Sequence, residues 1–420
     1  MGADELRAAM VAGLLAGGRI RAPAIERAFR TVPRHVFLPD TPMEQAYLDE
    51  AVATKWQDGV AVSSASQPSM MAIMLEQLEL RPGHQVLEIG TGTGYNAALM
   101  AELVGPTGSV VAVDIDDDLT LGAAEHLAAA GVAAGVTLAT RDGALGYPEL
   151  APYDRIVLTV GSWDVQPAWW RQLAPGGRLL LPLSVRGSQL SVALDLLERP
   201  TPLLHSASVR SCAFVRLRGR GAGPEPSRTI ADGLAVQAAD DRALDTAALL
   251  RLLDEPGPRR PTPVRLRTID LWDGLGLWLA VHEPDACRIL VSAANERYRS
   301  LALLPVGTDG GTMALVGGDG LAVLVASNDH ERGGCLPVSV RPCGADGAPL
   351  ADRLLECLRR WVAAGQPSAA QLRLRVHLGN SAAEPVPGTM QLVKEHSRLL
   401  LDWPSELSGE AGRETSKLAR

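Results

Sequence analysis

Short aliphatic runs alternate with helical stretches between about residues 85 and 183. This alternation predicts a parallel sheet covered by helices on both faces, the layered arrangement of an α/β fold. Before the sheet, the first forty residues predict two helices, the second opened by Pro23. Parallel strands are expected at 86–89, 109–113, 136–138, 155–160 and 178–182, and two further strands, with some antiparallel pairing at the sheet edge, at 190–194 and 213–217.

The pattern changes after a Gly/Pro-rich segment at residues 219–229, which is typical of a linker. We therefore predict an N-terminal domain at 1–218, the linker, a peptide-binding α+β domain at 230–403 and a flexible polar tail at 404–420. In the second domain, helices are expected at 243–253 and 350–362, and strands at 264–269, 277–281, 288–292, 301–306, 312–316, 321–326 and 375–378.

Composition limits the classes of partner. With 420 residues, 46% of them hydrophobic, the chain can bury the cores of two or three domains. A formal net charge of −8 argues against nucleic acid or an anionic membrane as the partner. The five cysteines form no Cys-x-x-Cys pair and fit free thiols in a reducing compartment. Because no signal-peptide pattern and no apolar run of ~18 residues is found, we expect a cytoplasmic protein and favour a monomer.

A glycine-rich loop follows the first predicted strand of the sheet. It reads Glu88-Ile-Gly90-Thr-Gly92-Thr-Gly94, and a helix is expected directly after it. A nicotinamide fingerprint needs glycine three positions after the second one, where this chain has Tyr95. Glycine at alternate positions instead suits a ligand without a pyrophosphate. We predict that the loop binds S-adenosylmethionine, with Glu88 near the ammonium group of its methionine part.

Two further acids follow the next predicted strands. Asp114 ends the second strand, where a carboxylate can accept hydrogen bonds from both ribose hydroxyls. Asp142 precedes Gly143 after the third strand, in position to accept from the adenine amino group. The alternative is that each acid only caps a helix, and this alternative is strongest for Asp142. The predicted cofactor residues are Glu88, Gly90, Thr91, Gly92, Gly94, Asp114, Ile115, Asp142 and Gly143.

A second set of residues lies upstream of the loop. Val32-Pro-Arg34, then Ser64-Ala-Ser66-Gln67-Pro68, then the glycine loop resemble the protein-L-isoaspartate O-methyltransferase family in order and spacing, over about residues 20–218. The resemblance implies a Rossmann-like class I S-adenosylmethionine methyltransferase domain behind an N-terminal helical segment. It also implies a peptide or protein substrate that presents an aspartyl or isoaspartyl carboxylate.

Carboxyl methylation agrees with the residues of this half of the chain. A carboxylate is anionic at neutral pH, so its attack on a sulfonium methyl group needs positioning but no general base. Accordingly, the sequence shows neither a His-carboxylate pair nor a metal-ligand cluster here. By resemblance, Ser66 is the active-site serine, whose hydroxyl would donate to one carboxylate oxygen, and Ser64, Gln67 and Pro68 shape the same substrate loop. Alternatively, Ser66 only caps a helix that starts near Pro68.

Two features depart from the family. After the fourth predicted strand the chain reads Gly161-Ser-Trp163-Asp-Val-Gln-Pro167-Ala-Trp169-Trp170, which is richer in Trp than typical repair enzymes. We expect Trp169 and Trp170 to pack in the core, whereas Trp163 either packs there or walls a substrate pocket. The second departure is the C-terminal extension, which a general repair enzyme does not need.

Three functions follow from these observations. The favoured one is methylation of an aspartate or isoaspartate in a ribosomally made peptide, because the chain resembles extended relatives that occur beside lanthipeptide, lasso or graspetide precursors. The methyl ester would then close to a succinimide, also called an aspartimide. The alternatives are general isoaspartyl repair and a non-catalytic peptide-binding scaffold, which the presence of Glu88, Asp114 and Ser66 disfavours.

Overall fold

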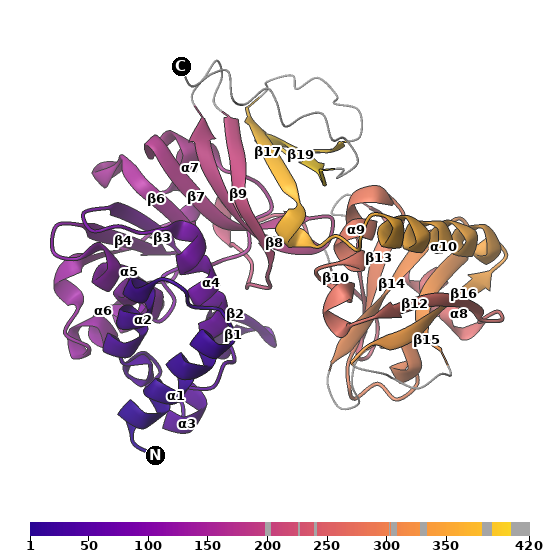
Figure 1. Ribbon diagram of the computed structural model, residues 1–420, viewed down its shortest axis with the longest axis horizontal. Coiled ribbons are helices and arrows are strands. Elements are labelled where there is room, and N and C mark those ends of the chain that lie inside the picture. Colours follow the sequence, from indigo (N-terminus) through magenta and orange to yellow (C-terminus); the bar gives the residue numbers. More distant parts are fainter. Residues whose placement is uncertain are drawn as a thin grey trace.

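Two sheets, each in its own lobe, organise the chain (Figure 1). The computed structural model describes residues 1–197, 203–225, 227–238, 242–301, 303, 309–327, 334–379 and 389–404. Within these ranges one sheet has ten strands and the other has seven, and β1 (Val52–Gln57) and β2 (Val60–Ala65) form a separate hairpin. No helix in the described part of the chain is long and apolar enough to cross a membrane.

The ten-stranded sheet is parallel at one end. Its order there is β5 (Val136–Thr140), β4 (Ser109–Asp114), β3 (Gln85–Ile89), β6 (Tyr153–Leu158) and β7 (Leu173–Val185), which confirms the five predicted strands. The chain proceeds from β3 outward to β5 and then crosses back to β6. Open α/β sheets bind ligands at such a switch point, outside the carboxyl ends of the strands.

Beyond β7 the sheet continues with antiparallel strands. β8 (Ser188–Leu197) confirms the strand expected at 190–194, and β9 (Leu203–Ser211) follows it. The prediction of a strand at 213–217 is wrong, because after β9 these residues leave the sheet and bind the loop after β6. The Gly161 amide donates to the Val215 carbonyl at 2.7 Å, and the Leu217 amide donates to the Gly161 carbonyl at 2.8 Å.

Helices cover both faces of this sheet unequally. Apolar side chains of α1, α2, α4, α5 and α6 bury one face in a single cluster, whereas Trp169 of α7 is buried against the other face. The two helices expected in the first forty residues are confirmed. The bounds are α1 (Ala3–Ala16), α2 (Pro23–Thr31), α3 (Met43–Ala46), α4 (Pro68–Leu78), α5 (Tyr95–Val104), α6 (Asp117–Ala129) and α7 (Pro167–Arg171), with short 3-10 helices that include η1 (Arg34–Phe37), η3 (Gly143–Leu145) and η5 (Gly219–Gly221).

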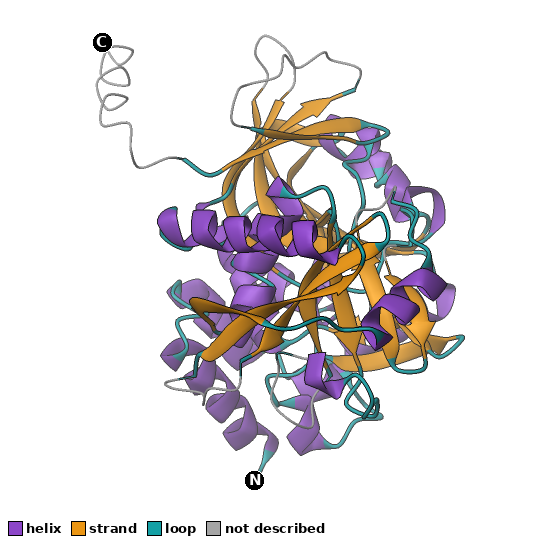
Figure 2. Cartoon of the chain, turned by 90° about the vertical axis from the view of Figure 1, so that its right-hand side faces the viewer, coloured by secondary structure: helices purple, strands orange, loops and turns teal. Residues whose placement is uncertain are grey.

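The seven-stranded sheet is antiparallel throughout and forms the second domain. Helix α10 packs on one face and α8 on the other; in Figure 2, α10 is the long helix that crosses in front of the strands. The sheet order is β10 (Ser227–Ala231), β11 (Leu234–Ala238), β13 (Ala286–Val291), β14 (Gly310–Gly317), β15 (Gly320–Ala326), β16 (Leu336–Gly344) and β12 (Arg260–Leu266), and the helices are α8 (Thr246–Asp254), α9 (Leu275–His282) and α10 (Gly347–Ala363).

Helix α9 corrects the strand predicted at 277–281. It lies between the two lobes: Leu277 and Val281 pack in the core of the ten-stranded sheet, and Leu275 and Leu279 pack in the core of the second domain. A helix that is buried all round has no polar face, so its apolar run cannot be distinguished from a buried strand by periodicity. The strand predicted at 301–306 lies largely outside the described residues.

The last strands return to the first sheet. β17 (Arg373–Leu378) pairs with β9, and β19 (Ser397–Asp402) and β18 (Met390–Val393) continue from it, as Figure 1 shows beside β9. The single domain predicted at 230–403 is therefore wrong at its C-terminal boundary, since the second domain is inserted between β9 and β17. A strand's apolar alternation shows that one face is buried but not which sheet it joins. Of the tail predicted at 404–420, residues 405–420 lie outside the described residues.

Candidate active site

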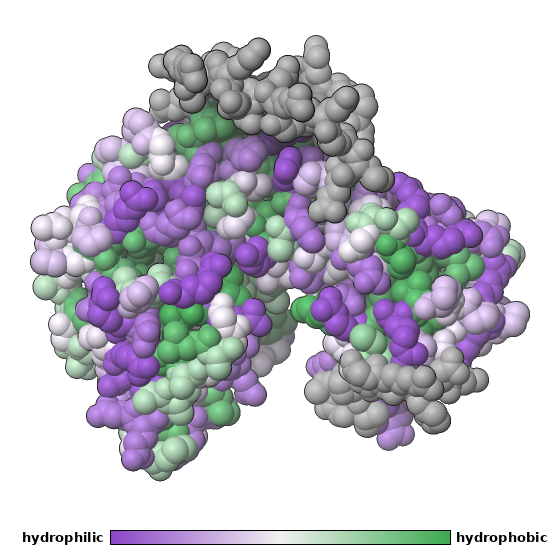
Figure 3. Space-filling view, viewed as in Figure 1, coloured by the Kyte–Doolittle hydropathy of each residue, from purple (hydrophilic) through white to green (hydrophobic). Residues whose placement is uncertain are grey.

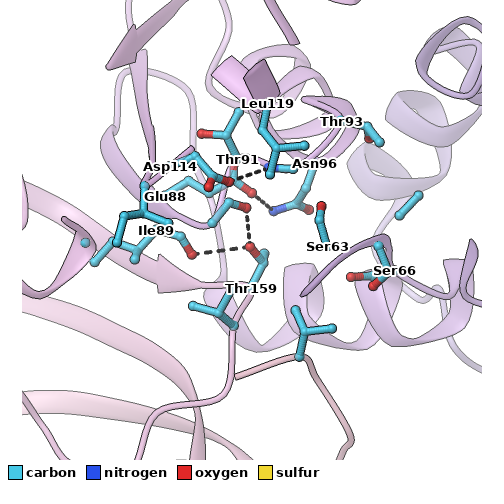
Figure 4. Close-up of a pocket in the computed structure, with 18 of the residues that line it drawn as sticks. Ser63, Ser66, Glu88, Ile89, Thr91, Thr93, Asn96, Asp114, Leu119 and Thr159 are labelled. Atoms are coloured by element: carbon cyan, nitrogen blue, oxygen red, sulfur yellow. Dashed lines mark hydrogen bonds between the residues drawn. The ribbon is translucent and has the colours of Figure 1, made fainter. Parts of the chain in front are cut away.

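The glycine loop joins β3 to α5 at the switch point of the sheet. Gly90 and Gly94 have φ values of 101° and 85°, in the region that favours glycine. At Gly90, a Cβ atom would also lie 2.7 Å from the Thr159 hydroxyl oxygen. Thr159 follows β6, and its hydroxyl donates to the Gly90 carbonyl at 2.5 Å (Figure 4). The ends of two parallel strands are thus held together under the loop.

A cofactor pocket opens at this point. Its lining comes from residues 62–66, 88–93, 95–96, 113–115, 159–160 and 215–218, with Arg34, Met71, Leu119 and Gly143. Most of the predicted cofactor residues are therefore brought together. The pocket also contains residues that sequence reasoning missed, among them Asn96, Thr159 and the segment 215–218.

Glu88 is fully buried in this pocket. Its Oε1 accepts a hydrogen bond from Asn96 Nδ2 at 2.7 Å, whereas its Oε2 has no partner among the described residues. Burial raises the pKa of the Glu88 carboxyl to about 8, the Asn96 hydrogen bond opposes this, and the charge of Asp114 adds to it. An unpartnered buried carboxylate oxygen is costly unless a ligand supplies a donor. An ammonium group would supply one, so the site fits the methionine part of S-adenosylmethionine.

Asp114 stands beside Glu88 at the end of β4. Its Oδ2 accepts from the Gly92 amide at 3.0 Å and its Oδ1 from the Asp116 amide at 3.3 Å. Burial raises the pKa of this carboxyl, and the Gly92 hydrogen bond lowers it. Each carboxylate oxygen can accept a second hydrogen bond. With Ile115 next to it in the lining, Asp114 fits the predicted ribose contact.

Two predicted cofactor residues do not line the pocket. Asp142 accepts at Oδ1 from the Ala144 amide at 2.9 Å and at Oδ2 from the Arg220 amide at 2.8 Å, so it caps η3 and ties the linker to it. Gly94 begins α5, where a Cβ atom would lie 3.1 Å from the Cβ of Ala123. Gly143 lines the pocket, and the adenine contact of Asp142 stays a prediction.

Ser66 and Ser64 line the cofactor pocket from the end of β2. Figure 4 shows Ser66 and Ser63 across the pocket from Glu88 and Ile89. Gln67 and not Ser66 occupies the N-cap position of α4, and it makes no side-chain capping hydrogen bond, so the capping alternative for Ser66 is wrong. Gln67 itself points away, since its amide donates to the Asp49 carbonyl at 2.8 Å, and Pro68 opens α4.

Arg34 is the most informative residue that sequence reasoning missed. It is fully buried and lines the pocket beside Ser66, whose carbonyl accepts from Nη2 at 2.9 Å. Its Nε donates to the Ala46 carbonyl at 2.9 Å, and its guanidinium lies 5.1 Å from the centre of the Tyr95 ring. Burial lowers the pKa of Arg34, but an arginine side chain stays protonated. Arg34 therefore holds a positive charge next to the predicted acceptor.

Trp163 lines a second pocket, here called the interdomain pocket, and Figure 3 shows the surface hollowed between the two lobes. Arg216 lines both pockets, so the two adjoin. Trp169 is buried in the core as expected, and its Nε1 donates to the Gly143 carbonyl at 2.8 Å. The interdomain pocket is lined by Gly161, Trp163, Ser184, residues 187–189, 211–214, Arg216, residues 223–225, Ser227, Gln237, Trp272 and Arg288.

Metal-binding clusters of three or more His, Cys, Asp or Glu are absent from the part of the chain that the structure describes. The five cysteines are free thiols. Burial raises the pKa of the thiols of Cys212, Cys287, Cys343 and Cys357, which is typical of unreactive thiols.

A pocket with two buried acids at the switch point of a Rossmann-like sheet is the arrangement of class I S-adenosylmethionine-dependent methyltransferases, and the protein is one of them. The sequence model of the protein-L-isoaspartate(D-aspartate) O-methyltransferase family matches residues 5–222. The chain belongs to this family. It is an enzyme that uses S-adenosylmethionine and acts on peptide or protein substrates, which confirms the resemblance.

Individual relatives match the same half of the chain. The protein-L-isoaspartate O-methyltransferase of Methanopyrus kandleri is 38% identical over 225 residues, which cover 52% of this chain and 94% of the relative. That of Hyperthermus butylicus is 36% identical over 222 residues, 51% of this chain and 89% of the relative. A solved structure described as a protein-L-isoaspartate O-methyltransferase covers 88% of this chain and 96% of its own, with 23% identity and a TM-score of 0.48.

Proposed function

We propose that the protein methylates an aspartyl or isoaspartyl carboxylate in a ribosomally made peptide that lies across both domains, as a step in maturation of that peptide. The observation that carries this proposal is the interdomain pocket. It adjoins the cofactor pocket at Arg216, and residues of the inserted domain, including Trp272, form part of its wall. Trp272 also lines a groove along β10 and β11, so this groove adjoins the interdomain pocket.

The chemistry needs positioning more than proton transfer. S-adenosylmethionine supplies an activated methyl group on a sulfonium centre. A peptide carboxylate oxygen forms the new bond to that methyl carbon while the carbon–sulfur bond breaks. The Ser66 hydroxyl donates to the other carboxylate oxygen, and the Arg34 charge favours the anionic acceptor. The following backbone amide nitrogen then attacks the ester carbonyl, and methanol leaves with the amide proton, which closes the succinimide.

The second domain is held against the catalytic sheet by polar contacts as well as by α9. The Ser211 hydroxyl donates to Asp273 Oδ1 at 2.7 Å, and the Ala369 amide donates to the Asp273 carbonyl at 3.2 Å. The chain also enters and leaves the domain beside β9 and β17. A domain fixed in this way can present a shaped surface to a peptide without having to order itself on binding. The free thiols favour a reducing cytoplasm as the place of action.

General isoaspartyl repair is the second candidate. The relatives favour it, because they are protein-L-isoaspartate O-methyltransferases that match only the catalytic half of this chain over most of their own length. A non-catalytic scaffold is disfavoured because Glu88, Asp114 and Ser66 all stand in the pocket.

A substrate comparison tests the proposal. The full chain is incubated with S-adenosylmethionine and either a cyclised peptide that contains unmodified aspartate or a generic linear isoaspartyl peptide, and mass spectrometry follows the gain of one methyl group. We expect faster turnover of the cyclised peptide. Equal or faster turnover of the linear peptide would identify a repair enzyme, and absence of cofactor binding by calorimetry would identify a scaffold. Deletion of the chain from residue 228 onward cannot be used to test the second domain, because it also removes β17, β18 and β19 from the catalytic sheet.

A further inference from the structure

Arg288 is a buried cation in the wall of the interdomain pocket. It belongs to β13 and is 5% exposed. Its Nη1 donates to the Gly187 carbonyl and to Gln237 Oε1, both at 3.0 Å, so it bridges the two domains. Its Nη2 makes longer contacts, 3.3 Å to the Leu271 carbonyl and 3.4 Å to the Ser188 hydroxyl. Its Nε has no hydrogen-bond partner among the described residues.

The charge of Arg288 is not neutralised by the described part of the chain. Burial lowers the pKa of its guanidinium to about 10, with only the Cys287 thiol acting against that shift. The group therefore remains protonated at neutral pH. All of its hydrogen-bond acceptors are neutral, and the Trp272 ring, whose centre is 4.4 Å from the guanidinium carbon, offers a weaker attraction than a carboxylate. A buried charge without a counter-charge is costly.

A comparison with the other buried arginines shows that a buried guanidinium without a counter-charge is unusual in this chain. Among the described residues three arginines are buried, Arg34, Arg178 and Arg288. Arg178 has carboxylate partners: its Nε lies 2.6 Å from Asp195 Oδ1, and its Nη1 lies 3.2 Å from Glu79 Oε1. Arg34 has no such ion pair with any described residue, and it lines the pocket in which an anionic acceptor is expected. Arg288 likewise has no ion pair among the described residues and lines a pocket, in this case the neighbouring interdomain pocket.

The rest of the interdomain pocket suits a peptide side chain. Trp163, Phe214 and Trp272 supply apolar walls, and Gln189 and Ser211 supply polar groups. The second arginine of the lining, Arg216, already forms an ion pair with Glu225. The lining therefore carries one positive charge in excess, at Arg288.

We propose that Arg288 binds a second carboxylate of the peptide substrate, distinct from the one that is methylated. The carboxylate belongs either to an aspartate or glutamate side chain or to the C-terminus of the peptide. This inference rests on the proposed function, in that a peptide must lie across both domains. It makes a single acidic group, set at a defined distance from the methylated residue, a determinant of substrate choice.

A charge-swap series tests this inference. Linear isoaspartyl peptides carry one glutamate, placed at successive positions on either side of the isoaspartate, and are compared with the same peptides carrying glutamine. Amidated C-termini distinguish the two possible sources of the carboxylate. For the wild-type protein we expect one acidic peptide to have a KM about tenfold below that of its neutral counterpart, since charge-assisted hydrogen bonds are lost in the neutral one.

The variant Arg288→Gln should lose this discrimination, so that both peptides have the higher KM, while kcat and the KM for S-adenosylmethionine stay unchanged. Arg341→Gln on β16, outside the interdomain pocket, is the matched control and should discriminate as the wild type does. Arg288→Lys keeps the charge without the planar fork and should discriminate only in part. Discrimination that survives in Arg288→Gln, or an equal rise in KM for acidic and neutral peptides, would overturn the proposal.

A binding measurement separates failure of this inference from failure of the proposed function. The same peptides are titrated against the protein while tryptophan fluorescence is followed, which requires no turnover. If no peptide is methylated but the acidic one still binds more tightly to the wild type than to Arg288→Gln, only the proposed function fails. If peptides are methylated with no difference between acidic and neutral forms at any position, only this inference fails. A purely structural Arg288 would lower the melting temperature when replaced and leave peptide discrimination intact.

Discussion

The cofactor pocket and the interdomain pocket differ in the ionisable groups that they bury. In the first, the ionisable groups at the carboxyl ends of β3 and β4 are the buried acids Glu88 and Asp114. In the second, the buried ionisable group is the cation Arg288. Arg34 stands beside Ser66, at the acceptor side of the first pocket. The two acids at the ends of β3 and β4 suit a cationic methyl donor, and the buried arginines beside Ser66 and in the interdomain pocket suit an anionic peptide, so these groups separate the places of donor and acceptor.

The largest expected effect comes from removing the Glu88 carboxyl group from the cofactor pocket. Glu88→Gln should weaken S-adenosylmethionine binding about 10- to 100-fold, because the ammonium group loses a charge-assisted hydrogen bond. Isothermal titration calorimetry measures the Kd. Glu102→Gln, on the exposed side of α5, is the matched control and should bind as the wild type does. An unchanged Kd for Glu88→Gln would show that Oε2 does not receive the ammonium group.

Ser66→Ala should impair methylation of the peptide acceptor without weakening binding of the methyl donor. We expect kcat/KM for a peptide substrate to fall about tenfold or more, because one oriented hydroxyl donor to the acceptor carboxylate is lost. The Kd for S-adenosylmethionine should not change. Ser69→Ala, at the second residue of α4 and outside the pocket lining, tests whether the effect is specific to the pocket. A fall in cofactor affinity equal to the fall in peptide turnover would mean that Ser66 belongs to the donor side instead.

Cofactor binding should depend on pH through Glu88. In the free protein the pKa of this carboxyl is about 8, against 4.5 for an ordinary glutamate. A bound cation favours the ionised form and so lowers this pKa. Affinity should therefore fall up to about tenfold per pH unit as the pH drops below 8, and level off above it. Titration calorimetry between pH 6 and pH 9 checks this, and Glu88→Gln should show a flat profile.

The same shift predicts the stability of the unliganded protein. The folded state keeps the Glu88 proton between pH 4.5 and about 8, where the unfolded state releases it. This group therefore stabilises the folded state below pH 4.5, and its contribution is lost as the pH rises through 8. Melting temperatures across this range should decline less for Glu88→Gln than for the wild type.

The two pockets were not equally predictable from sequence. Glu88 and Asp114 lie at the carboxyl ends of apolar strands in a regular αβ pattern, so their placement at one end of the sheet could be inferred from position alone. Arg34 and Arg288 could not be found in this way, because the sequence does not record whether a buried arginine has a carboxylate partner. Their hydrogen-bond partners are carbonyl, hydroxyl, amide and thioether groups that only the folded chain brings close.

The fold, too, was predictable from the sequence in some elements and not in others. Strands β3 to β7 were predictable because their apolar runs are short and are separated by helices or by loops with short helical turns. Helix α9 was not, because both lobes bury it. The return of β17 to the first sheet was not either, because its pairing with β9 joins residues more than a domain apart in the sequence.

Trp163→Ala tests whether the interdomain pocket binds the peptide substrate. Trp163 lines the interdomain pocket and lies against Gly223, where a Cβ atom would be 2.2 Å from the tryptophan Cβ. Loss of an aromatic wall should raise the KM for a peptide substrate about fivefold to tenfold, with no change in the Kd for S-adenosylmethionine. Trp56→Ala, at an exposed position on the β1–β2 hairpin, is the matched control. A change in cofactor affinity for Trp163→Ala would mean that the two pockets do not act separately.

The smallest expected effect concerns the β1–β2 hairpin, which contributes residues 62–66 to the cofactor pocket. Lys55 Nζ lies 2.9 Å from Asp116 Oδ2 and 2.7 Å from Asp118 Oδ1, and Arg218 Nη2 lies 2.6 Å from the same Asp116 oxygen. The pKa of Asp116 is lowered, chiefly by the Arg218 hydrogen bond. Because these pairs are partly exposed, Lys55→Ala should weaken S-adenosylmethionine binding only about twofold to threefold.

This effect should also disappear in high salt, since exposed charges are screened. Calorimetry at low and at molar ionic strength measures both expectations. A loss of tenfold or more that persists in salt would show that the hairpin holds the cofactor through its ordered position and not through these ion pairs. In that case Glu88 and Asp114 would not by themselves account for binding of the methyl donor, and the hairpin would have to be counted as part of the donor site.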